Sequence, residues 1–268
     1  MAPMTGAPSP DTALIGPGDP PPVTVGRPGG ASPYIIICEH AGNAIPKRLG
    51  ALGLEAGNLE RHIAYDIGAA DVAGAMSGHL DATLILQPYS RLVADCNRAP
   101  DDPEFIVTLS EDVEIPGNID LDDADAEARR REVFRPFHDR IAAELDARRA
   151  AGRPSRIVSV HSFTPVFDGR TRPWQVGIMY NRDRRLADVL LGLLAGQGDL
   201  CVGDNQPFQM TGDNVYTLPV HAGRRGVPGV EIEIRQDLIA TRAGREAWAA
   251  RLGRLLERAG EALSGLEH

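Results

Sequence analysis

The sequence has little cysteine and few aromatic residues. Its three cysteines are scattered along 268 residues and show no Cys-x-x-Cys spacing, which argues against a disulfide framework and against a thiolate metal site. This usage of cysteine is typical of a reducing compartment, so we expect a cytoplasmic protein. Aromatic residues make up only 5% of a chain that is 43% hydrophobic. The core must therefore be built mostly from Leu, Ile, Val and Ala.

Long apolar runs and excess positive charge are also missing. No apolar run approaches the roughly 18 residues that a membrane span needs. The formal net charge of -9 argues against a nucleic acid as partner, because a phosphate backbone attracts basic proteins. We therefore expect neither a nucleic acid nor a membrane as partner.

The first 32 residues differ in composition from the rest. Residues 1–32 are rich in Pro, Gly, Ser and Ala and lack a basic segment followed by an apolar one, so they predict a flexible or draped tail rather than a signal peptide. Residues 33–268 contain no internal repeat and no linker. Their length suits a single domain.

Apolar, β-branched runs alternate with amphipathic segments along this domain. The pattern predicts a three-layer α/β/α sandwich around a mixed, largely parallel sheet. Strands are expected at 34–38, 82–87, 156–161, 174–180, 200–203 and 229–235, and helices at 59–78, 125–151, 184–196 and 242–263. Two long irregular segments, 110–125 and 204–228, separate some of these elements.

Two expected strands end on a histidine, His40 and His161. The carboxyl ends of parallel strands meet at one edge of a sheet, and two histidines with one carboxylate are a usual ligand set of a catalytic zinc. Asp66 is the best-placed carboxylate. Glu39 is a weaker candidate because strand alternation turns it away from His40, and Asn43 carries a neutral amide that binds zinc poorly.

The expected helix 59–78 carries Asp66 together with His62. A spacing of four residues puts both side chains on one face of a helix. An ordinary pair on the helix surface is therefore the alternative to a ligand role.

Glu233 lies on an expected strand whose apolar residues are Val230, Ile232 and Ile234. Alternation places Glu231, Glu233 and Arg235 on the same face of this strand. Glu233 is thus either a general base beside the zinc or one half of a structural ion pair with Arg235.

A polar loop follows the strand at 82–87. It contains Arg91, Asn97 and Arg98 within eight residues, and a guanidinium presents a planar fork to a carboxylate. We interpret this group as a site for an anionic ligand, although any single arginine in a loop is more often solvated.

Other loops offer weaker signals. The basic pairs Arg170/Arg172 and Arg224/Arg225 are more typical of a solvated surface. His221, between them in a glycine-containing loop, could donate to an oxyanion or be merely exposed.

Five stretches together resemble the N-formylglutamate amidohydrolase family, which is similar to zinc carboxypeptidases and aspartoacylases. They span the chain from about residue 34 to 240, and their order and combination are more specific than any one of them. They are Glu39–Pro46 (EHAGNAIP), His62–Gly68 (HIAYDIG), Ser90–Arg98 (SRLVADCNR), Val160–Pro165 (VHSFTP) and Glu231–Ile239 (EIEIRQDLI).

The resemblance implies roles for several of these residues. By the carboxypeptidase pattern, His40 and His161 hold zinc and Glu233 is the catalytic glutamate. The chain departs from this pattern at Asn43, where carboxypeptidases place a glutamate ligand, and Asp66 is our substitute.

The same resemblance implies how a substrate is bound. Asn97 and Arg98 match the pair that grips a substrate carboxylate, and Arg91 corresponds to the arginine that polarises the scissile carbonyl. From its place in the loop, and not from the resemblance, we assign His221 to assist Arg91 at the oxyanion. We therefore expect a zinc-dependent amidohydrolase that cleaves an N-acyl (N-formyl-type) amino acid such as N-formylglutamate. A carboxypeptidase-like peptidase and a non-catalytic metal- or ligand-binding protein are the alternatives.

Overall fold

The computed structural model describes residues 13–266, and its centre is one mixed sheet of seven strands in the order β1-β3-β2-β6-β11-β9-β10. The four strands from β3 to β11 are parallel to one another, whereas β1 and β9 run antiparallel to β3 and β11. The strands are β1 (Thr24–Gly26), β2 (Tyr34–Cys38), β3 (Thr83–Leu86), β6 (Arg156–Phe163), β9 (Val176–Met179), β10 (Val202–Asp204) and β11 (Gly229–Arg235). The expected largely parallel sheet is confirmed.

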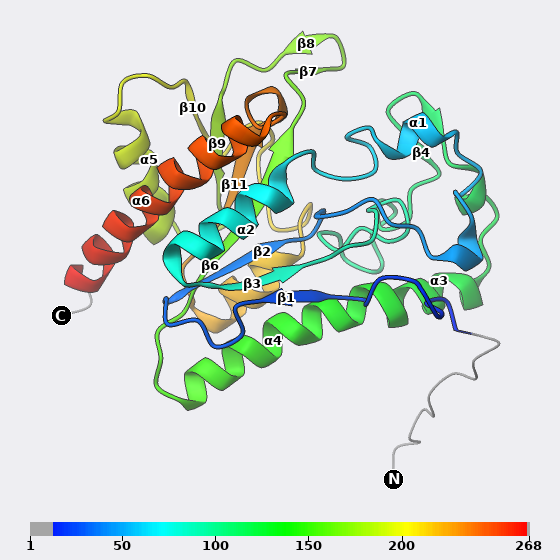
Figure 1. Cartoon of the computed structure of the whole chain (residues 1–268), viewed down its shortest axis with the longest axis horizontal. Coiled ribbons are helices and arrows are strands. Elements are labelled where there is room, and N and C mark those ends of the chain that lie inside the picture. Colours follow the sequence, from blue (N-terminus) through cyan, green and yellow to red (C-terminus); the bar gives the residue numbers. More distant parts are fainter. Residues whose placement is uncertain (1–12, 267–268) are drawn as a thin grey trace.

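Helices cover both faces of this sheet. One face is covered by α2, α5 and α6, and the other by α4 (Figure 1). The helices are α1 (Ala56–Leu59), α2 (Ala69–Leu80), α3 (Asp123–Arg129), α4 (Arg135–Ala150), α5 (Arg185–Ala195) and α6 (Arg242–Leu266). A π-helical turn, Arg130–Phe134, joins α3 to α4. Among the described residues, none of these helices is long and apolar enough to cross a lipid bilayer.

Two small hairpins lie outside the main sheet. The first pairs β4 (Leu109–Ser110) with β5 (Val113–Glu114), and the second pairs β7 (Val166–Phe167) with β8 (Arg170–Thr171). The second hairpin follows β6 directly, and it projects beyond the sheet in Figure 1.

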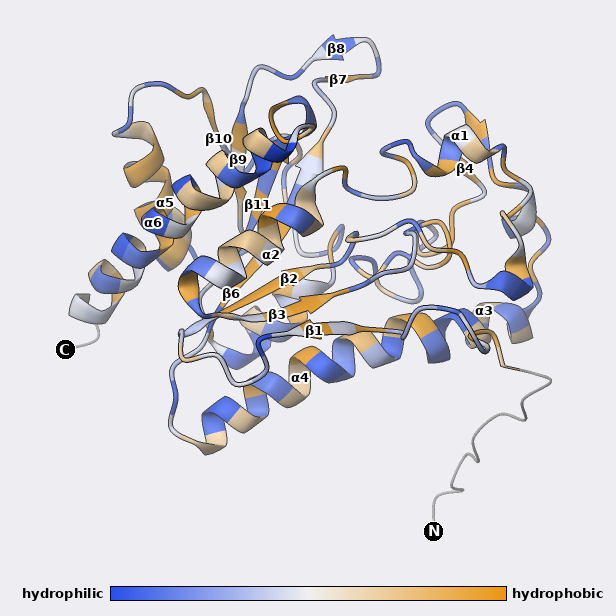
Figure 2. Cartoon of the chain, viewed as in Figure 1, coloured by the Kyte–Doolittle hydropathy of each residue, from blue (hydrophilic) through white to orange (hydrophobic). Residues whose placement is uncertain are grey.

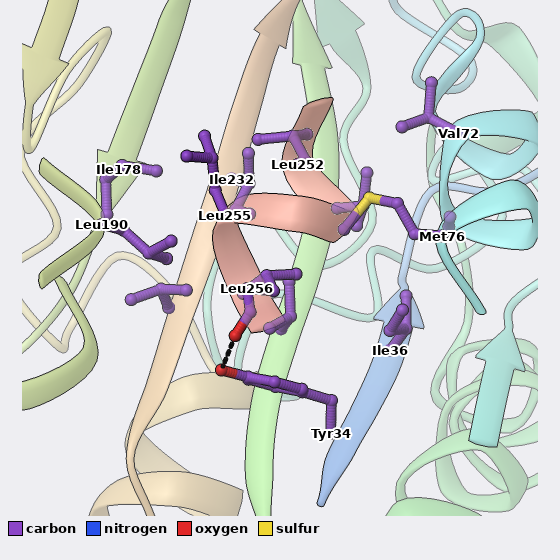
Figure 3. Close-up of a cluster of buried hydrophobic side chains, with 14 of the residues drawn as sticks. Tyr34, Ile36, Val72, Met76, Ile178, Leu190, Ile232, Leu252, Leu255 and Leu256 are labelled. Atoms are coloured by element: carbon purple, nitrogen blue, oxygen red, sulfur yellow. Dashed lines mark hydrogen bonds between the residues drawn. The ribbon is translucent and has the colours of Figure 1, made fainter. Parts of the chain in front are cut away.

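The sheet divides the hydrophobic core into two clusters. Along β2, Ile36 faces the helices α2 and α6, while Ile35 and Ile37 face the α4 side. Along most of their length β2 and β3 are coloured as hydrophobic in Figure 2, because strands covered on both faces need no polar side. In the cluster on the α2 and α6 side, the Tyr34 hydroxyl donates a hydrogen bond of 2.7 Å to the Leu256 carbonyl (Figure 3). This bond ties β2 to α6.

The part of the expected tail that the structure describes is ordered. β1 pairs with the edge of β3, and the backbone N–H groups of Leu14 and Ile15 donate to the Glu132 carboxylate at 2.8 and 2.9 Å. Contacts of this kind are those of a draped segment. A three-residue strand between prolines and glycines leaves no clear periodicity, so composition alone gave no sign of β1. Residues 1–12 lie outside the described residues.

The prediction of a helix over residues 59–78 is wrong in its first half. α1 ends at Leu59 and α2 begins only at Ala69, so that His62 and Asp66 lie in the intervening loop. Gly68 ends this loop with a φ of 80°, a conformation that glycine adopts without strain. A Cβ at Gly68 would also meet the Ile239 carbonyl oxygen at 2.6 Å.

Candidate active site

A group of buried polar side chains lies where the parallel strands β2, β6 and β11 end. His40 follows β2 by two residues, and His161 on β6 is paired in register with Glu233 on β11. All three side chains are buried. The carboxyl edge of parallel strands is the usual place of an active-site crevice in α/β proteins, and the chain places its polar residues there.

The two histidines and Asp66 come together in three dimensions. Asp66 Oδ2 lies 2.7 Å from His161 Nδ1 and 3.5 Å from His40 Nδ1. Ligand atoms of these three residues all lie within 4.8 Å of one another. A backbone hydrogen bond of 3.0 Å from Asp66 N–H to the His40 carbonyl holds the loop in place. Asp66 therefore reaches the site from a loop.

The other nitrogen of each imidazole contacts a second carboxylate. His40 Nε2 lies 2.7 Å from Asp95 Oδ1, and His161 Nε2 lies 3.0 Å from Glu39 Oε2. The Ser159 hydroxyl donates to the same Glu39 oxygen at 2.6 Å. Carboxylates in this position fix the orientation of metal-binding histidines and make them more basic. Glu39, which alternation turns away from His40, serves His161 instead.

The charges around His161 favour a bound cation. Burial alone would lower the pKa of His161, but the carboxylates of Glu231 and Glu39 outweigh burial and raise this pKa to about 10. Burial and the nearby Arg91 guanidinium instead lower the pKa of His40 to about 4. In the described structure, His40 Nδ1 is buried and has no hydrogen-bond partner.

The donor set therefore fits zinc. Two imidazole Nδ1 atoms and one carboxylate converge, and nitrogen and oxygen donors of this kind are common zinc ligands. A metal-binding histidine must be neutral, so a divalent cation would take over the positive charge that protonated His161 supplies. The second group of possible ligands, His161 with Glu231 and Glu233, shares this histidine.

Asp95 provides a direct test of whether this donor set binds zinc. Asp95→Asn keeps the shape of the side chain but removes the charge that orients His40, and we expect zinc affinity to fall about 10- to 100-fold. Competition with a chromophoric chelator measures this affinity. Asp101→Asn, at an exposed position in the same loop, should bind zinc as the wild type does. Equal affinities in all three proteins would contradict a role for Asp95.

Glu233 is a carboxylate of the site that does not belong to the group formed by His40, Asp66 and His161. Its Oε2 atom is buried and has no hydrogen-bond partner among the described residues. Burial raises the pKa of Glu233 to about 7, with a further upward contribution from Glu231. Arg235 does not neutralise it, because the Arg235 guanidinium bonds the Asp237 carboxylate at 2.8 Å. The structure thus lacks the Glu233–Arg235 ion pair that was the alternative to a general base.

Asn97 supports Glu231. Its side-chain amide donates to Glu231 Oε2 at 3.0 Å, and its carbonyl oxygen accepts from the Thr217 backbone N–H at 3.2 Å. Both ends of the amide are therefore bound within the protein. This arrangement favours a positioning role for Asn97 over the expected contact with a substrate.

Arg91 and Arg98 lie in the same loop as Asn97, and each is bound to another residue of the protein. The Arg91 guanidinium bonds the Asp66 carboxylate. The Arg98 guanidinium forms a 2.8 Å ion pair with Glu104 and also donates to the Asn214 carbonyl. Arg91 and Arg98 both line the cavity described next.

A cavity of about 220 Å³ opens over these residues. It contains most of the side chains expected from the sequence, together with the aromatic rings of Phe167 and Phe208. It also contains Arg172, which sequence reasoning set aside as solvated. The lining is His40, His62, Asp66, Arg91, Asp95, Asn97, Arg98, His161, Ser162, Phe167, Arg172, Phe208, Asn214, Val215, Glu231 and Glu233.

His221 is not among these lining residues. It lies in a π-helical turn, Leu218–Ala222, with its Nε2 atom 2.9 Å from His138 Nδ1. The rings of His221 and His138 are stacked, and the structure does not bring His221 to the cavity. The local sequence around His221 could not predict this contact, because His138 is about 80 residues away in the chain.

Fold and site together define an α/β protein with an enzyme-like polar cavity at the carboxyl ends of its parallel strands. A family model described as N-formylglutamate amidohydrolase matches residues 32–240. The chain belongs to the N-formylglutamate amidohydrolase family. Membership supports an amidohydrolase, a hydrolase that acts on amides.

Two solved structures resemble the chain. The crystal structure of a gene product from Agrobacterium tumefaciens is 41% identical, has a TM-score of 0.89, and covers 95% of this chain and 100% of its own. N-formylglutamate amidohydrolase from Ralstonia eutropha is 19% identical, has a TM-score of 0.61, and covers 91% of this chain and 99% of its own. At this identity the second structure shows the shared fold. No curated protein matches the chain.

Proposed function

We propose that the chain is a zinc-dependent amidohydrolase that cleaves an N-acyl (N-formyl-type) amino acid such as N-formylglutamate. One observation carries the proposal. The Nδ1 atoms of His40 and His161 both face Asp66, while carboxylates hold both Nε2 atoms. Family membership supports the amide as the bond that is cleaved.

His40, Asp66 and His161 would hold the zinc. When bound there, zinc would supply Lewis-acid chemistry, which polarises a carbonyl group and makes water more acidic. Asp95 and Glu39 would keep the two imidazoles oriented through their Nε2 atoms. These contacts leave both Nδ1 atoms directed at the shared site.

Glu233 would act as the general base. It accepts a proton from water as the water oxygen bonds to the acyl carbon, and it delivers this proton to the amide nitrogen as the C–N bond breaks. A carboxylate with a pKa of about 7 is suited to both steps near neutral pH. Glu231 is a poorer base because the Asn97 amide already donates to it.

Arg91 would stabilise the oxyanion that forms during attack. It lines the cavity beside Asp66, and a preorganised cation at the developing charge commonly contributes a factor of about a hundred or more. His221 has no part in this scheme because it is not among the residues that line the cavity, and its Nε2 atom lies 2.9 Å from His138 Nδ1.

A hydrolysis screen tests the proposal. The zinc-loaded protein should hydrolyse N-formyl, N-acetyl or longer N-acyl amino acids, and the release of free amine measures turnover. Treatment with a chelator should abolish turnover because the ligand set then lacks its cation, and added zinc should restore it. Turnover that survives removal of all metal would contradict zinc dependence.

The same screen separates the alternatives. Faster hydrolysis of dipeptides than of N-formyl substrates would indicate a carboxypeptidase-like peptidase. Binding of zinc and of N-acyl amino acids without any turnover would indicate a non-catalytic binding protein.

A further inference from the structure

Three arginines line the active-site cavity, and they differ in how they are bound. The Arg91 guanidinium is bonded to Asp66, and the Arg98 guanidinium is paired with Glu104 at 2.8 Å. Arg172 has no carboxylate partner within residues 13–266. Among the three cavity arginines, Arg172 is therefore the one whose charge forms no ion pair with another described residue.

The fold holds Arg172 firmly at the cavity wall. It follows β8 of the second hairpin, and its backbone N–H donates to the Pro165 carbonyl at 2.8 Å. The guanidinium lies 4.5 Å from the centre of the Phe167 ring and 5.8 Å from that of Phe163. Its only side-chain hydrogen bond in the described structure is a long contact of 3.4 Å to the Thr164 hydroxyl.

Such a guanidinium is well suited to bind an anion. Aromatic faces orient the planar fork without using up its N–H donors. Because the fork is already positioned, less conformational entropy is lost when a ligand binds. Arg172 also lies close enough to Glu233 for the two charges to influence each other.

We propose that Arg172 binds a carboxylate of the substrate and so selects N-acyl amino acids over uncharged N-acyl amines. This proposal rests on the amidohydrolase function proposed above. It assigns to Arg172 the role that the sequence suggests for Arg98, whose guanidinium already has Glu104 and Asn214 as partners. The carboxylate is either the α-carboxylate or a side-chain carboxylate, which present the same group to the fork.

Two substrate pairs distinguish the two carboxylates. N-formyl-leucine and N-formyl-leucinamide differ only in the α-carboxylate, and N-formylglutamate and N-formylglutamine differ only in the side-chain carboxylate. We expect the wild type to prefer the charged member of at least one pair. Arg172→Ala should raise KM for that member about 10- to 100-fold, as expected for a lost charge-assisted contact, and leave KM for the neutral member unchanged.

Matched variants separate a specific contact from general electrostatic attraction. Arg170→Ala removes an exposed arginine from the same hairpin and should leave both KM values unchanged. Arg172→Lys keeps the charge but loses the planar fork, so its KM for the charged substrate should lie between those of the wild type and the alanine variant. Equal effects of Arg172→Ala on both members of each pair would overturn the proposal, as would a loss of discrimination in Arg98→Ala alone.

A binding measurement keeps this result independent of catalysis. If the zinc-loaded wild type hydrolyses none of these substrates, the proposed function fails. Calorimetry with N-formyl-leucine and N-formylglutamate then tests Arg172 by itself. Binding that weakens about tenfold or more in Arg172→Ala supports the contact. Equal binding to both proteins, or no binding to the wild type, overturns it.

Discussion

Replacing Glu233 with glutamine is expected to lower kcat by about 10²- to 10⁴-fold, the usual contribution of a general base. Glutamine keeps the shape of the side chain but cannot accept a proton from the attacking water. Zinc content should not change, because Glu233 is not one of the proposed ligands His40, Asp66 and His161. Steady-state kinetics and metal analysis on the same preparation check both expectations.

Thermal melting of this variant distinguishes a catalytic role from a structural one. Breaking a buried ion pair costs about 3–5 kcal/mol, but Arg235 pairs with Asp237 rather than with Glu233. Glu233→Gln should therefore melt close to the wild type, as should the exposed control Glu261→Gln. A Glu233→Gln protein that melts early yet turns over at a near wild-type rate while folded would make Glu233 structural.

Removing both histidines should abolish zinc binding. The double variant His40→Ala/His161→Ala retains only Asp66 of the three proposed ligands, and a single carboxylate cannot hold zinc tightly in competition with water. Metal analysis after dialysis should give close to one zinc per wild-type chain and almost none for the variant. Circular dichroism should show that the fold persists, because the hydrophobic clusters on both faces of the sheet are untouched.

The control for this experiment is His79→Ala. His79 lies on α2 with its Nε2 atom 3.7 Å from the exposed Glu257 carboxylate. It is not among the residues that line the cavity. Zinc should be retained in full by this variant. A double variant that still holds one equivalent of zinc would show that the metal site lies elsewhere.

The strand ends were the most readable part of the site. Apolar runs that stop near His40 and His161, or that carry Glu233, predict buried strands with polar ends, and the parallel sheet brings these ends together. Strand alternation also predicted that Glu39 points away from His40. It could not show that Glu39 contacts His161 on the neighbouring strand, because that contact depends on the strand order.

Residues in loops were harder to interpret. Asp66 was expected on a helix, but it lies in the loop before α2. This loop ends at Gly68, whose backbone is left-handed. Arg172 looked like a solvated arginine because its partners are aromatic rings brought close by a hairpin. His221 likewise finds its partner across the fold. In each case the deciding contact is tertiary and leaves no local pattern.

The position of β11 has a consequence for how the chain is made. This strand lies between β6 and β9 in the sheet, yet it is the last strand in the sequence. During synthesis from the N-terminus, β6 and β9 exist before the strand that joins them, so each keeps an unpaired edge until residue 235 has emerged. Unpaired edges readily associate with other chains. The nascent protein is therefore most exposed to misassembly late in translation, and the arrival of β11 removes both open edges while it delivers Glu231 and Glu233 to the site.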